Sequence, residues 1–167
     1  TELVYNGYRC AEERVLGGAE GVGAGFKQMM DALEVGRVNV AARGVGIAQR
    51  ALELALRYSQ ERKTFGKPIA QHQAIQFKLA DMATQVDAAR LLTIRAARMK
   101  DAGERSDIEA GMAKLFASEA GRFCVEESFR IHGGYGYSKE YEIERLYRDA
   151  PLLLIGEGTS EIQRMVI

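Results

Sequence analysis

Apolar side chains recur at intervals of three and four residues over most of the chain, beginning near residue 25. The first such stripe comprises Phe26, Met30, Leu33, Ala41, Val45, Ala48, Leu52 and Leu56. Charged side chains fill many of the positions between them, so the apolar positions share one face of an α-helix. The spacing predicts a helix of about 35 residues, far above the mean length of about 11–12. Helices of this length usually belong to bundles.

Two further long helices are predicted. A second stripe of apolar and small side chains comprises Ile75, Leu79, Met82, Val86, Ala89, Thr93 and Ala96, and it predicts a helix over residues 73–100. Residues 101–104 then supply a turn, and Asp107 is a candidate N-cap for a third helix that runs to residue 131. Three long helices without an internal repeat predict an antiparallel bundle.

The remaining segments are short. Residues 1–8 have the pattern of a β-strand, and the glycines that follow predict a flexible loop before the first helix. A glycine-rich break is expected at residues 133–136, then a short helix over 140–149 and another after Gly158. The pattern as a whole is that of an all-α protein with a short strand remnant at its beginning.

Composition excludes several classes of protein. Hydrophobic residues make up 47% of the 167 positions, which is enough for a packed core. Lys and Arg together number 23 and so do Asp and Glu, so nothing indicates binding to nucleic acid or to an anionic membrane. Cys10 and Cys124 are too few for a disulfide framework, which favours a reduced, intracellular setting. No apolar run is long enough to span a bilayer.

Both ends indicate that the sequence is a piece of a longer chain. It begins at Thr1 without a Met and passes directly into the strand pattern. It stops at Ile167 inside a helical pattern, without the Gly or Pro that commonly ends a helix.

The loop between the two longest predicted helices, residues 60–69, concentrates hydrogen-bond donors. Arg62 supplies a guanidinium, Thr64 supplies a hydroxyl, and a bend leaves backbone N–H groups free. Phosphate and pyrophosphate groups are bound by such donors. An ordinary polar turn closed by Pro68 has the same composition, and composition alone favours that interpretation.

Residues 131–137 contain adjacent glycines. Gly133 and Gly134 would let the backbone approach a flat or phosphorylated ligand without interference from a Cβ atom, but a helix end followed by a wide turn gives the same pattern. The segment is not a dinucleotide-binding fingerprint, because no strand precedes it and the glycine spacing differs. His132 is a candidate base, although a packed, hydrogen-bonded histidine is the more ordinary role.

Glu157 follows a four-residue apolar run and has a glycine on each side. Such surroundings remove water from a carboxylate and disfavour its charged form, which suits a base that removes a proton near neutral pH. The alternative makes Thr159 or Ser160 the N-cap of the last helix and Glu157 a loop acid without a chemical role. The segment alone leaves both interpretations open.

Taken together, the order and spacing of these segments resemble the acyl-CoA dehydrogenase family. The resemblance is carried by Arg62-Lys63-Thr64-Phe65-Gly66, Gly133-Gly134-Tyr135-Gly136, Arg148-Asp149-Ala150 and Glu157-Gly158-Thr159-Ser160. It extends over essentially the whole chain. It implies the antiparallel four-helix bundle of the family's C-terminal, FAD-binding domain over residues 25–167, and the end of the middle β-domain with its linker over residues 1–24.

The resemblance implies FAD as cofactor and a fatty or related acyl-CoA thioester as substrate. The product would be a trans-2-enoyl-CoA, and an electron-transferring flavoprotein would accept the electrons. Glu157 matches the base that takes the α-proton while the β-hydrogen leaves as hydride, and its backbone N–H would bind the thioester carbonyl. One subset of the family carries its base on the first long helix, but the matching position here is Gly36. Arg37 matches an arginine beside the catalytic carboxylate.

The resemblance also implies binding residues, and no metal. Those for the cofactor are Arg62, Thr64, Phe65, Arg130, Gly133, Gly134, Thr159 and Glu161. Those for the substrate are Glu34, Arg37, Gly156, Glu157 and Gly158. The Arg62 segment would bind the FAD of a neighbouring subunit, so a complete site requires a homo-oligomer, a dimer or the tetramer usual in the family. Arg130 and Gly156 depart from the family pattern, in which Gln and Tyr are common.

Two other functions fit parts of the sequence. Acyl-CoA oxidases and flavin monooxygenases share the fold implied by the resemblance. A helical interaction domain without chemistry is the third interpretation, but Glu157, Arg62 and the neutral net charge argue against it. Alone, the chain is expected to bind FAD weakly and to turn over nothing, because catalysis needs a closed, dry site. The expected location is the cytoplasm of a bacterium or the mitochondrial matrix of a eukaryote.

Overall fold

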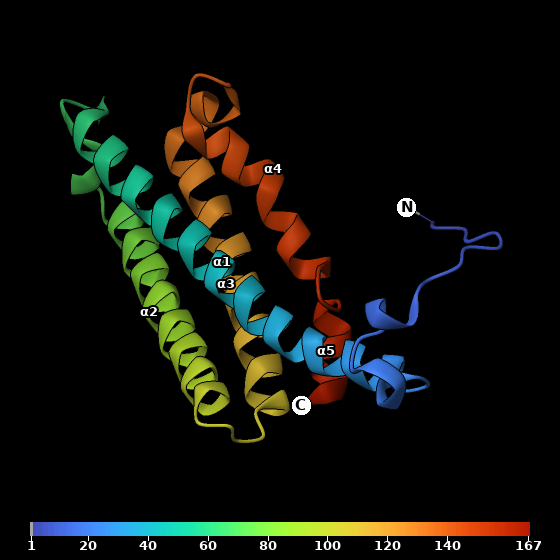
Figure 1. Cartoon of the computed structure of the whole chain (residues 1–167). Coiled ribbons are helices and arrows are strands. Elements are labelled where there is room, and N and C mark those ends of the chain that lie inside the picture. Colours follow the sequence, from blue (N-terminus) through green and yellow to red (C-terminus); the bar gives the residue numbers. More distant parts are fainter. Residues whose placement is uncertain (1) are drawn as a thin grey trace. The chain divides into compact units, whose positions relative to one another are not determined.

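The structure, a computed structural model, describes residues 2–167 and is dominated by helices (Figure 1). The chain divides into two compact units, one that ends at Leu33 and one that comprises Glu34–Ile167. Helix α1 (Gly25–Glu61) crosses this boundary, so its first turns belong to the first unit. The expected all-α class with an antiparallel helical bundle is confirmed.

The first unit contains two short 3-10 helices, η1 (Glu12–Arg14) and η2 (Gly18–Gly21), before α1 begins. The strand expected over residues 1–8 is not formed in residues 2–8, and Thr1 lies outside the described residues. A strand needs a neighbour to bond its backbone N–H and C=O groups. Residues 2–33 contain no second strand that would supply one.

The bundle comprises four long helices that run alternately in opposite directions (Figure 1). After α1 come α2 (Gln73–Asp101), α3 (Asp107–His132), the 3-10 turn η4 (Gly133–Tyr137) and α4 (Glu142–Ile155). The short α5 (Ser160–Val166) follows. Because neighbours in sequence are antiparallel, the α1–α2 connection and η4 lie at one end of the bundle. The segment between α4 and α5 lies toward the other end.

The third helix begins without a side-chain cap. Ser106, not Asp107, occupies the N-cap position, and its hydroxyl donates to the Glu34 carboxylate at 2.6 Å instead of capping the helix. Asp107 is the first helical residue and accepts a hydrogen bond from Arg105 at 2.8 Å. A carboxylate in the first turn interacts favourably with the helix dipole.

The fourth helix is longer than the segment 140–149 that its pattern predicts. It continues through Pro151 to Ile155, although a proline inside a helix removes one backbone hydrogen bond. Ala150 and Leu153 are buried on either side of Pro151. Burial of this face therefore outweighs the local preference to stop.

A small β-hairpin, which the sequence pattern does not predict, connects α1 to α2. Its strands β1 (Lys63–Thr64) and β2 (Lys67–Pro68) pair antiparallel. The two turn residues, Phe65 and Gly66, have φ values of 50° and 80°. Positive φ at both positions is the geometry of a type I′ turn, which matches the twist of a two-stranded hairpin.

Two buried clusters form the core. One contains the larger side chains and draws on all four long helices, with Leu52, Met82, Val86, Val125, Ile143 and Leu146 among its members. The other consists of alanines at helix contacts, namely Ala41, Ala89, Ala96, Ala113, Ala117 and Ala120. Small side chains allow helix backbones to approach closely, so the alanine cluster marks where the helices are nearest.

Helices α1 and α3 approach each other closely at two glycines. A Cβ atom on Gly44 would lie 2.6 Å from the Ala117 carbonyl oxygen, and one on Gly121 would lie 3.2 Å from the Gly44 carbonyl oxygen. Neither contact can be relieved by rotating a side chain, because both involve backbone atoms. Glycine at position 44 is therefore required by packing.

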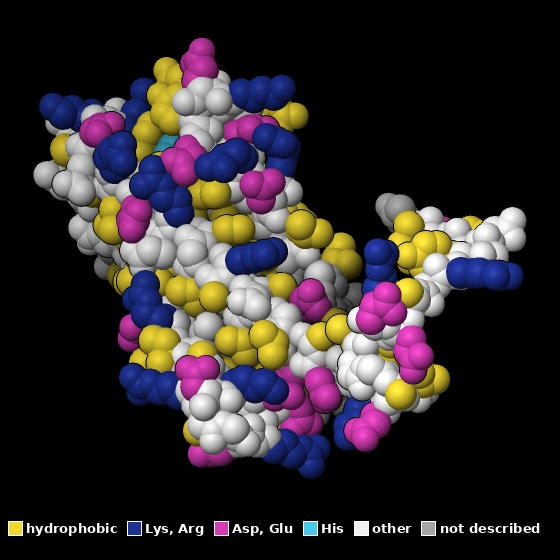
Figure 2. Space-filling model, viewed as in Figure 1, with side chains coloured by type: hydrophobic (Ala, Val, Ile, Leu, Met, Phe, Trp, Pro, Cys, Tyr) yellow, Lys and Arg dark blue, Asp and Glu magenta, His cyan; other side chains and the backbone are white. Residues whose placement is uncertain are grey.

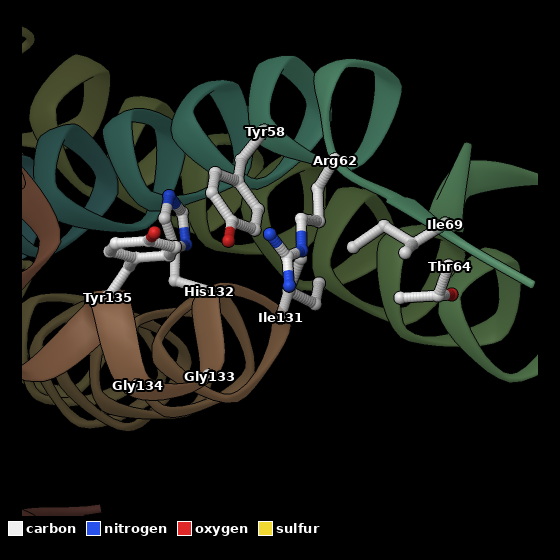
Figure 3. Close-up of a pocket in the computed structure, with 9 residues that line it drawn as sticks. All are labelled: Tyr58, Arg62, Thr64, Ile69, Ile131, His132, Gly133, Gly134 and Tyr135. Atoms are coloured by element: carbon white, nitrogen blue, oxygen red, sulfur yellow. The ribbon is translucent and has the colours of Figure 1, made fainter. Parts of the chain in front are cut away.

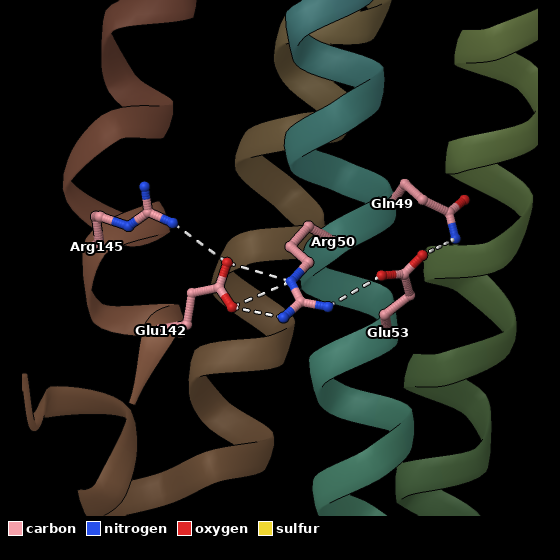
Figure 4. Close-up of polar contacts among 5 residues, drawn as sticks. All are labelled: Gln49, Arg50, Glu53, Glu142 and Arg145. Atoms are coloured by element: carbon pink, nitrogen blue, oxygen red, sulfur yellow. Dashed lines mark hydrogen bonds and ion pairs between the residues drawn. The ribbon is translucent and has the colours of Figure 1, made fainter. Parts of the chain in front are cut away.

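A salt bridge links α1 to the beginning of α4 (Figure 4). The Arg50 guanidinium donates to both carboxylate oxygens of Glu142, with the shortest bond, from Nη2 to Oε2, at 2.6 Å. Arg50 also donates to Glu53 at 3.2 Å, and Arg145 donates to Glu142 at 3.2 Å. These side chains are partly exposed, so the network fixes the register of the helices more than it adds stability.

The surface carries charges of both signs. On the face drawn in Figure 2, basic and acidic side chains are interspersed over the bundle and do not gather into a patch of one sign. Within residues 2–167, no helix combines the length and the apolar character that a membrane crossing requires.

Gly44→Ala should lower the free energy of unfolding by about 1–3 kcal/mol, because the new methyl group overpacks the α1–α3 contact. Gly46→Ala is the matched control, since a Cβ there meets nothing within 4 Å and the helical propensity of Ala should raise stability by up to about 1 kcal/mol. Chemical denaturation of both variants measures the difference. Equal effects at the two positions would contradict the close approach.

Candidate functional site

The residues singled out from the sequence lie in two regions of the bundle. Arg62, Thr64, Gly133 and Gly134 lie at the end formed by the hairpin and η4. The Glu157 segment follows α4, whose 14 residues extend for about 21 Å away from that end.

A cavity of about 500 Å³ lies at the hairpin end of the bundle (Figure 3). Side chains from the end of α1, from the hairpin and from the α3–η4 junction line it. They include Tyr58, Arg62, Thr64, His132, Gly133 and Tyr135. The structure thus brings together four of the predicted cofactor-binding residues, which lie about 70 positions apart in the sequence.

Aromatic rings form one wall of this cavity. The Tyr58 ring stacks on the His132 imidazole with centroids 4.3 Å apart, and Tyr135 lies against Tyr141 at 5.1 Å. The Arg62 guanidinium reaches toward the same rings, 6.0 Å from the centroid of Tyr135 (Figure 3). The cavity therefore offers flat apolar faces beside a fixed positive charge.

His132 has a structural role in this wall. Its Nδ1 lies 2.7 Å from the Ser128 carbonyl oxygen, an acceptor, so Nδ1 carries the proton and donates it. Burial lowers the pKa of His132 below its usual value, and the hydrogen bond to Ser128 opposes that shift. The imidazole is therefore packed and neutral, which is the ordinary role considered for it.

The glycines of η4 leave backbone accessible at the cavity. Cβ atoms built on Gly133 and Gly134 would meet nothing within 4 Å, and the φ of Gly133 is 59°.

Two other predicted cofactor residues, Phe65 and Arg130, do not line the cavity. Phe65 is 96% exposed at the hairpin turn, and the guanidinium of Arg130 pairs with Glu126 at 3.0 Å.

At the other region the Glu157 carboxylate lies against Gly36 of α1. A Cβ on Gly36 would come within 2.7 Å of Glu157 Oε2, so the carboxylate occupies the space that a side chain at position 36 would fill. Glu157 has a φ of 58°, which a non-glycine residue rarely adopts. Strained backbone of this kind clusters at functional sites.

Two charged residues of α1 close to Gly36 in the sequence, Glu34 and Arg37, have distinct environments. Arg37 has a buried Nε without a hydrogen-bond partner within residues 2–167. Glu34 accepts hydrogen bonds from Ser106 and pairs with Lys100 at 3.2 Å. The hydrogen bond from Ser106 is the main reason why the pKa of Glu34 is lowered. The Glu34 carboxylate therefore links α1 to the adjoining ends of α2 and α3.

The beginning of α5 agrees with the expectation that Thr159 or Ser160 is the N-cap of the last helix. The Thr159 hydroxyl accepts a hydrogen bond from the Ile162 N–H at 3.3 Å and so caps the helix. A hydrogen bond from its own backbone N–H, followed by one from the Thr159 hydroxyl, lowers the pKa of the exposed Glu161. The structure thus combines an N-cap at Thr159 with a Glu157 carboxylate that lies beside Gly36.

Lys114 is a residue of this region that the sequence analysis missed. It lies in the second turn of α3, is completely buried, and donates to the Gly158 carbonyl at 2.7 Å and the Leu154 carbonyl at 3.3 Å. The position of Lys114 in the sequence pattern of α3 indicates that its side chain is buried. Lys114 falls on the same stripe of α3 as the small residues Ala110, Ala117 and Gly121, where a solvated lysine is not expected.

Comparison with known proteins shows the family of the chain. Residues 23–167 match the family model described as the acyl-CoA dehydrogenase, C-terminal domain. The chain belongs to the acyl-CoA dehydrogenase family. A probable acyl-CoA dehydrogenase of Bacillus subtilis is 55% identical over 143 residues, which are 86% of this chain and 38% of that protein.

Two further relatives show the range of the family. A caffeyl-CoA reductase–Etf complex subunit of Acetobacterium woodii is 50% identical over 146 residues, which are 87% of this chain and 38% of that protein. The solved structure of butyryl-CoA dehydrogenase from Megasphaera elsdenii is 47% identical, with a TM-score of 0.84 over 85% of this chain and 37% of that one. The chain thus spans less than half the length of these acyl-CoA dehydrogenase relatives.

The burial of His132 predicts a pH dependence of stability. Its pKa in the folded protein lies below the value of 6.5 that an exposed histidine has, so the unfolded state binds more protons as the pH falls below about 6.5. The free energy of unfolding should therefore be at its full value above this pH and should decrease below it. Denaturation of the wild type and His132→Asn at pH 7.5 and pH 5.5 measures the effect. The wild type should lose more stability between the two pH values than the variant, and equal losses would contradict the assignment.

Proposed function

We propose that this chain is the C-terminal domain of a flavin-dependent acyl-CoA dehydrogenase in which Glu157 removes the α-proton of the substrate. The observation that carries the proposal is the Glu157 carboxylate, seated against Gly36 on positive-φ backbone. A non-glycine residue in this conformation costs about 1–3 kcal/mol and persists only where the surrounding structure imposes it. Catalysis explains why a glutamate is retained there.

Membership of the family supports the role of each neighbouring group. The backbone N–H of Glu157 would donate to the thioester carbonyl and stabilise the negative charge that develops on its oxygen. Arg37, whose Nε has no partner within residues 2–167, would orient the carboxylate or the bound thioester. Glu34, Gly156 and Gly158 complete the proposed substrate contacts.

The reaction divides between the chain and its cofactor. FAD, when bound, supplies the acceptor for the hydride that leaves the β-carbon. Glu157 supplies the base that takes the α-proton, with the carboxylate held in one position by Gly36 and the surrounding backbone. In the opposite direction, enoyl-CoA reduction, the same carboxyl group would return the proton. A relative named as a reductase is compatible with either direction.

The cavity at the hairpin end fits part of FAD. Arg62 and Thr64 offer a charge-assisted donor and a hydroxyl, while Gly133 and Gly134 leave backbone open to a phosphate or a flat ring. The aromatic wall around Tyr58 adds stacking surface. Phe65, Arg130, Thr159 and Glu161 remain proposed cofactor contacts, and they lie outside this cavity.

The proposal extends to partners. The resemblance assigns the hairpin cavity to the FAD of a neighbouring subunit, so we infer a homo-oligomer, a dimer or a tetramer. An electron-transferring flavoprotein is the proposed electron partner, which the name of the Etf-complex relative supports. The proposed location is the bacterial cytoplasm or the mitochondrial matrix. The residues before 25 are proposed to be the end of a middle β-domain.

Glu157→Gln in the full-length protein should reduce the rate of flavin reduction by acyl-CoA by at least about 100-fold, because the amide cannot accept the proton. FAD content and the affinity for a product analogue should change little, since the side chain keeps its size. Stopped-flow absorbance of the flavin measures the rate. Glu104→Gln, at an exposed position, is the control. A variant that retains the wild-type rate would contradict the assignment.

Arg62→Met should weaken the binding of FAD to the full-length oligomer by about 10- to 100-fold, because a charge-assisted hydrogen bond contributes about 1.5–3 kcal/mol. Lys63→Met removes the neighbouring exposed charge and should have little effect. Titration of the apoprotein with FAD, followed by flavin fluorescence, gives both dissociation constants. Equal weakening by the two variants would show that only the net charge of the hairpin matters.

A further inference from the structure

The backbone on both sides of Glu157 is bonded to two buried side chains from other helical segments. Lys114 of α3 donates to the carbonyls of Leu154 and Gly158, which flank Glu157 in the sequence. Gln163 of α5 donates from Nε2 to the carbonyls of Glu157 at 3.0 Å and Gly158 at 3.1 Å. Three carbonyls within five residues are therefore fixed by Lys114 and Gln163, which we call the carbonyl clamp.

Both members of the carbonyl clamp are fully buried. Lys114 has the largest fully buried side chain within residues 2–167, and Gln163 is also inaccessible to solvent. A buried ammonium is costly unless it is hydrogen-bonded, so its position must be matched by acceptors. Leu154 lies in the last turn of α4, where carbonyls have no partner within the helix and the helix dipole is negative. The Lys114 ammonium needs acceptors and the Leu154 carbonyl needs a donor, so the hydrogen bond between them satisfies both groups.

The conformation that the clamp holds is unfavourable on its own. Glu157 has a φ of 58° and Gly158 a φ of 98°. A Cβ on Gly158 would come 2.7 Å from Gln163 Nε2, so glycine is needed where the amide crosses the backbone. Without the bonds from Lys114 and Gln163, the Glu157 backbone would relax toward a negative φ. The carboxylate would then move away from Gly36.

The ammonium also faces other charged groups. Burial lowers the pKa of Lys114, and Glu119 of α3, Glu161 of α5 and Glu157 oppose that shift, whereas Arg37 of α1 adds to it. Lys114 therefore lies within electrostatic reach of Glu157 and Arg37 together. Its hydrogen bonds go to backbone carbonyls and not to a carboxylate, so its contribution is to hold the backbone.

We propose that Lys114, assisted by Gln163, is the positioning residue of the proton-abstraction step. It holds the Leu154–Gly158 backbone so that the Glu157 carboxylate faces the substrate α-carbon. This inference rests on the proposed function of Glu157. It adds that the rate of the reaction depends on a side chain of α3 that touches neither substrate nor cofactor.

The test is Lys114→Met in the full-length holoenzyme, since Met keeps most of the volume and loses the donors. The kcat should fall by about 10- to 100-fold, because a displacement of about 1 Å at a reacting group has an effect of this size. The KM and the FAD content should stay within about threefold of the wild type. Hydrogen–deuterium exchange should become faster in peptides that span residues 152–160 and remain unchanged in those of α2.

Two further variants separate positioning from general loss of stability. Met82→Ala removes a buried side chain of the core cluster and should lower the melting temperature without lowering kcat or loosening residues 152–160. Gln163→Met removes the second donor and should reproduce the Lys114→Met pattern in a milder form. If Lys114→Met does not fold, the same measurements on Gln163→Met test the inference.

The possible outcomes are distinguishable. A fall of kcat in Met82→Ala as large as in the clamp variants would overturn the inference, because stability alone would explain it. Normal kcat and normal exchange in the clamp variants would overturn it as well. If no acyl-CoA reduced the flavin of the wild type and no enoyl-CoA oxidised the reduced flavin, the proposed function would fail. Exchange at residues 152–160 would still show whether the clamp holds the backbone.

Discussion

The close approach of α1 to its neighbours is the constraint on which the rest of the structure depends. Gly44 lets α1 lie against the Ala117 carbonyl of α3, and Gly36, about two turns earlier, leaves space for the Glu157 carboxylate. Both glycines belong to one face of the helix, together with the buried Val40 and Ala48. The packing that closes the bundle therefore also determines where the candidate base can lie.

The same helix connects the two regions that are proposed to bind the cofactor and to hold the base. Gly36 lies against the Glu157 carboxylate, while Tyr58 and Arg62 at the other end of α1 line the hairpin cavity. A rigid helix keeps these groups at a fixed separation. In an oligomer of the proposed kind, each α1 would contribute to the base of one site and to the cofactor contacts of another. This arrangement explains why residues so far apart belong to one function.

Periodicity was sufficient to predict the long helices, because burial of one face imposes its spacing on the sequence. It failed where a tertiary contact overrode a local preference. The helix α4 continues through Pro151 since Ala150 and Leu153 are buried, and a residue in the left-handed region at Phe65 forms a hairpin turn. Lys114 was overlooked because its acceptors, the carbonyls near Glu157, lie about 40 residues away and become neighbours only in the fold.

The Glu157 carboxylate beside Gly36 is the proposed base of the reaction. The most direct measurement is exchange of the substrate α-proton with deuterated solvent, followed by mass spectrometry in the full-length wild type and in Glu157→Gln. We expect exchange in the wild type and a rate at least about 100-fold lower in the variant, with the acyl-CoA still bound. Exchange at the wild-type rate in Glu157→Gln would show that the base lies elsewhere.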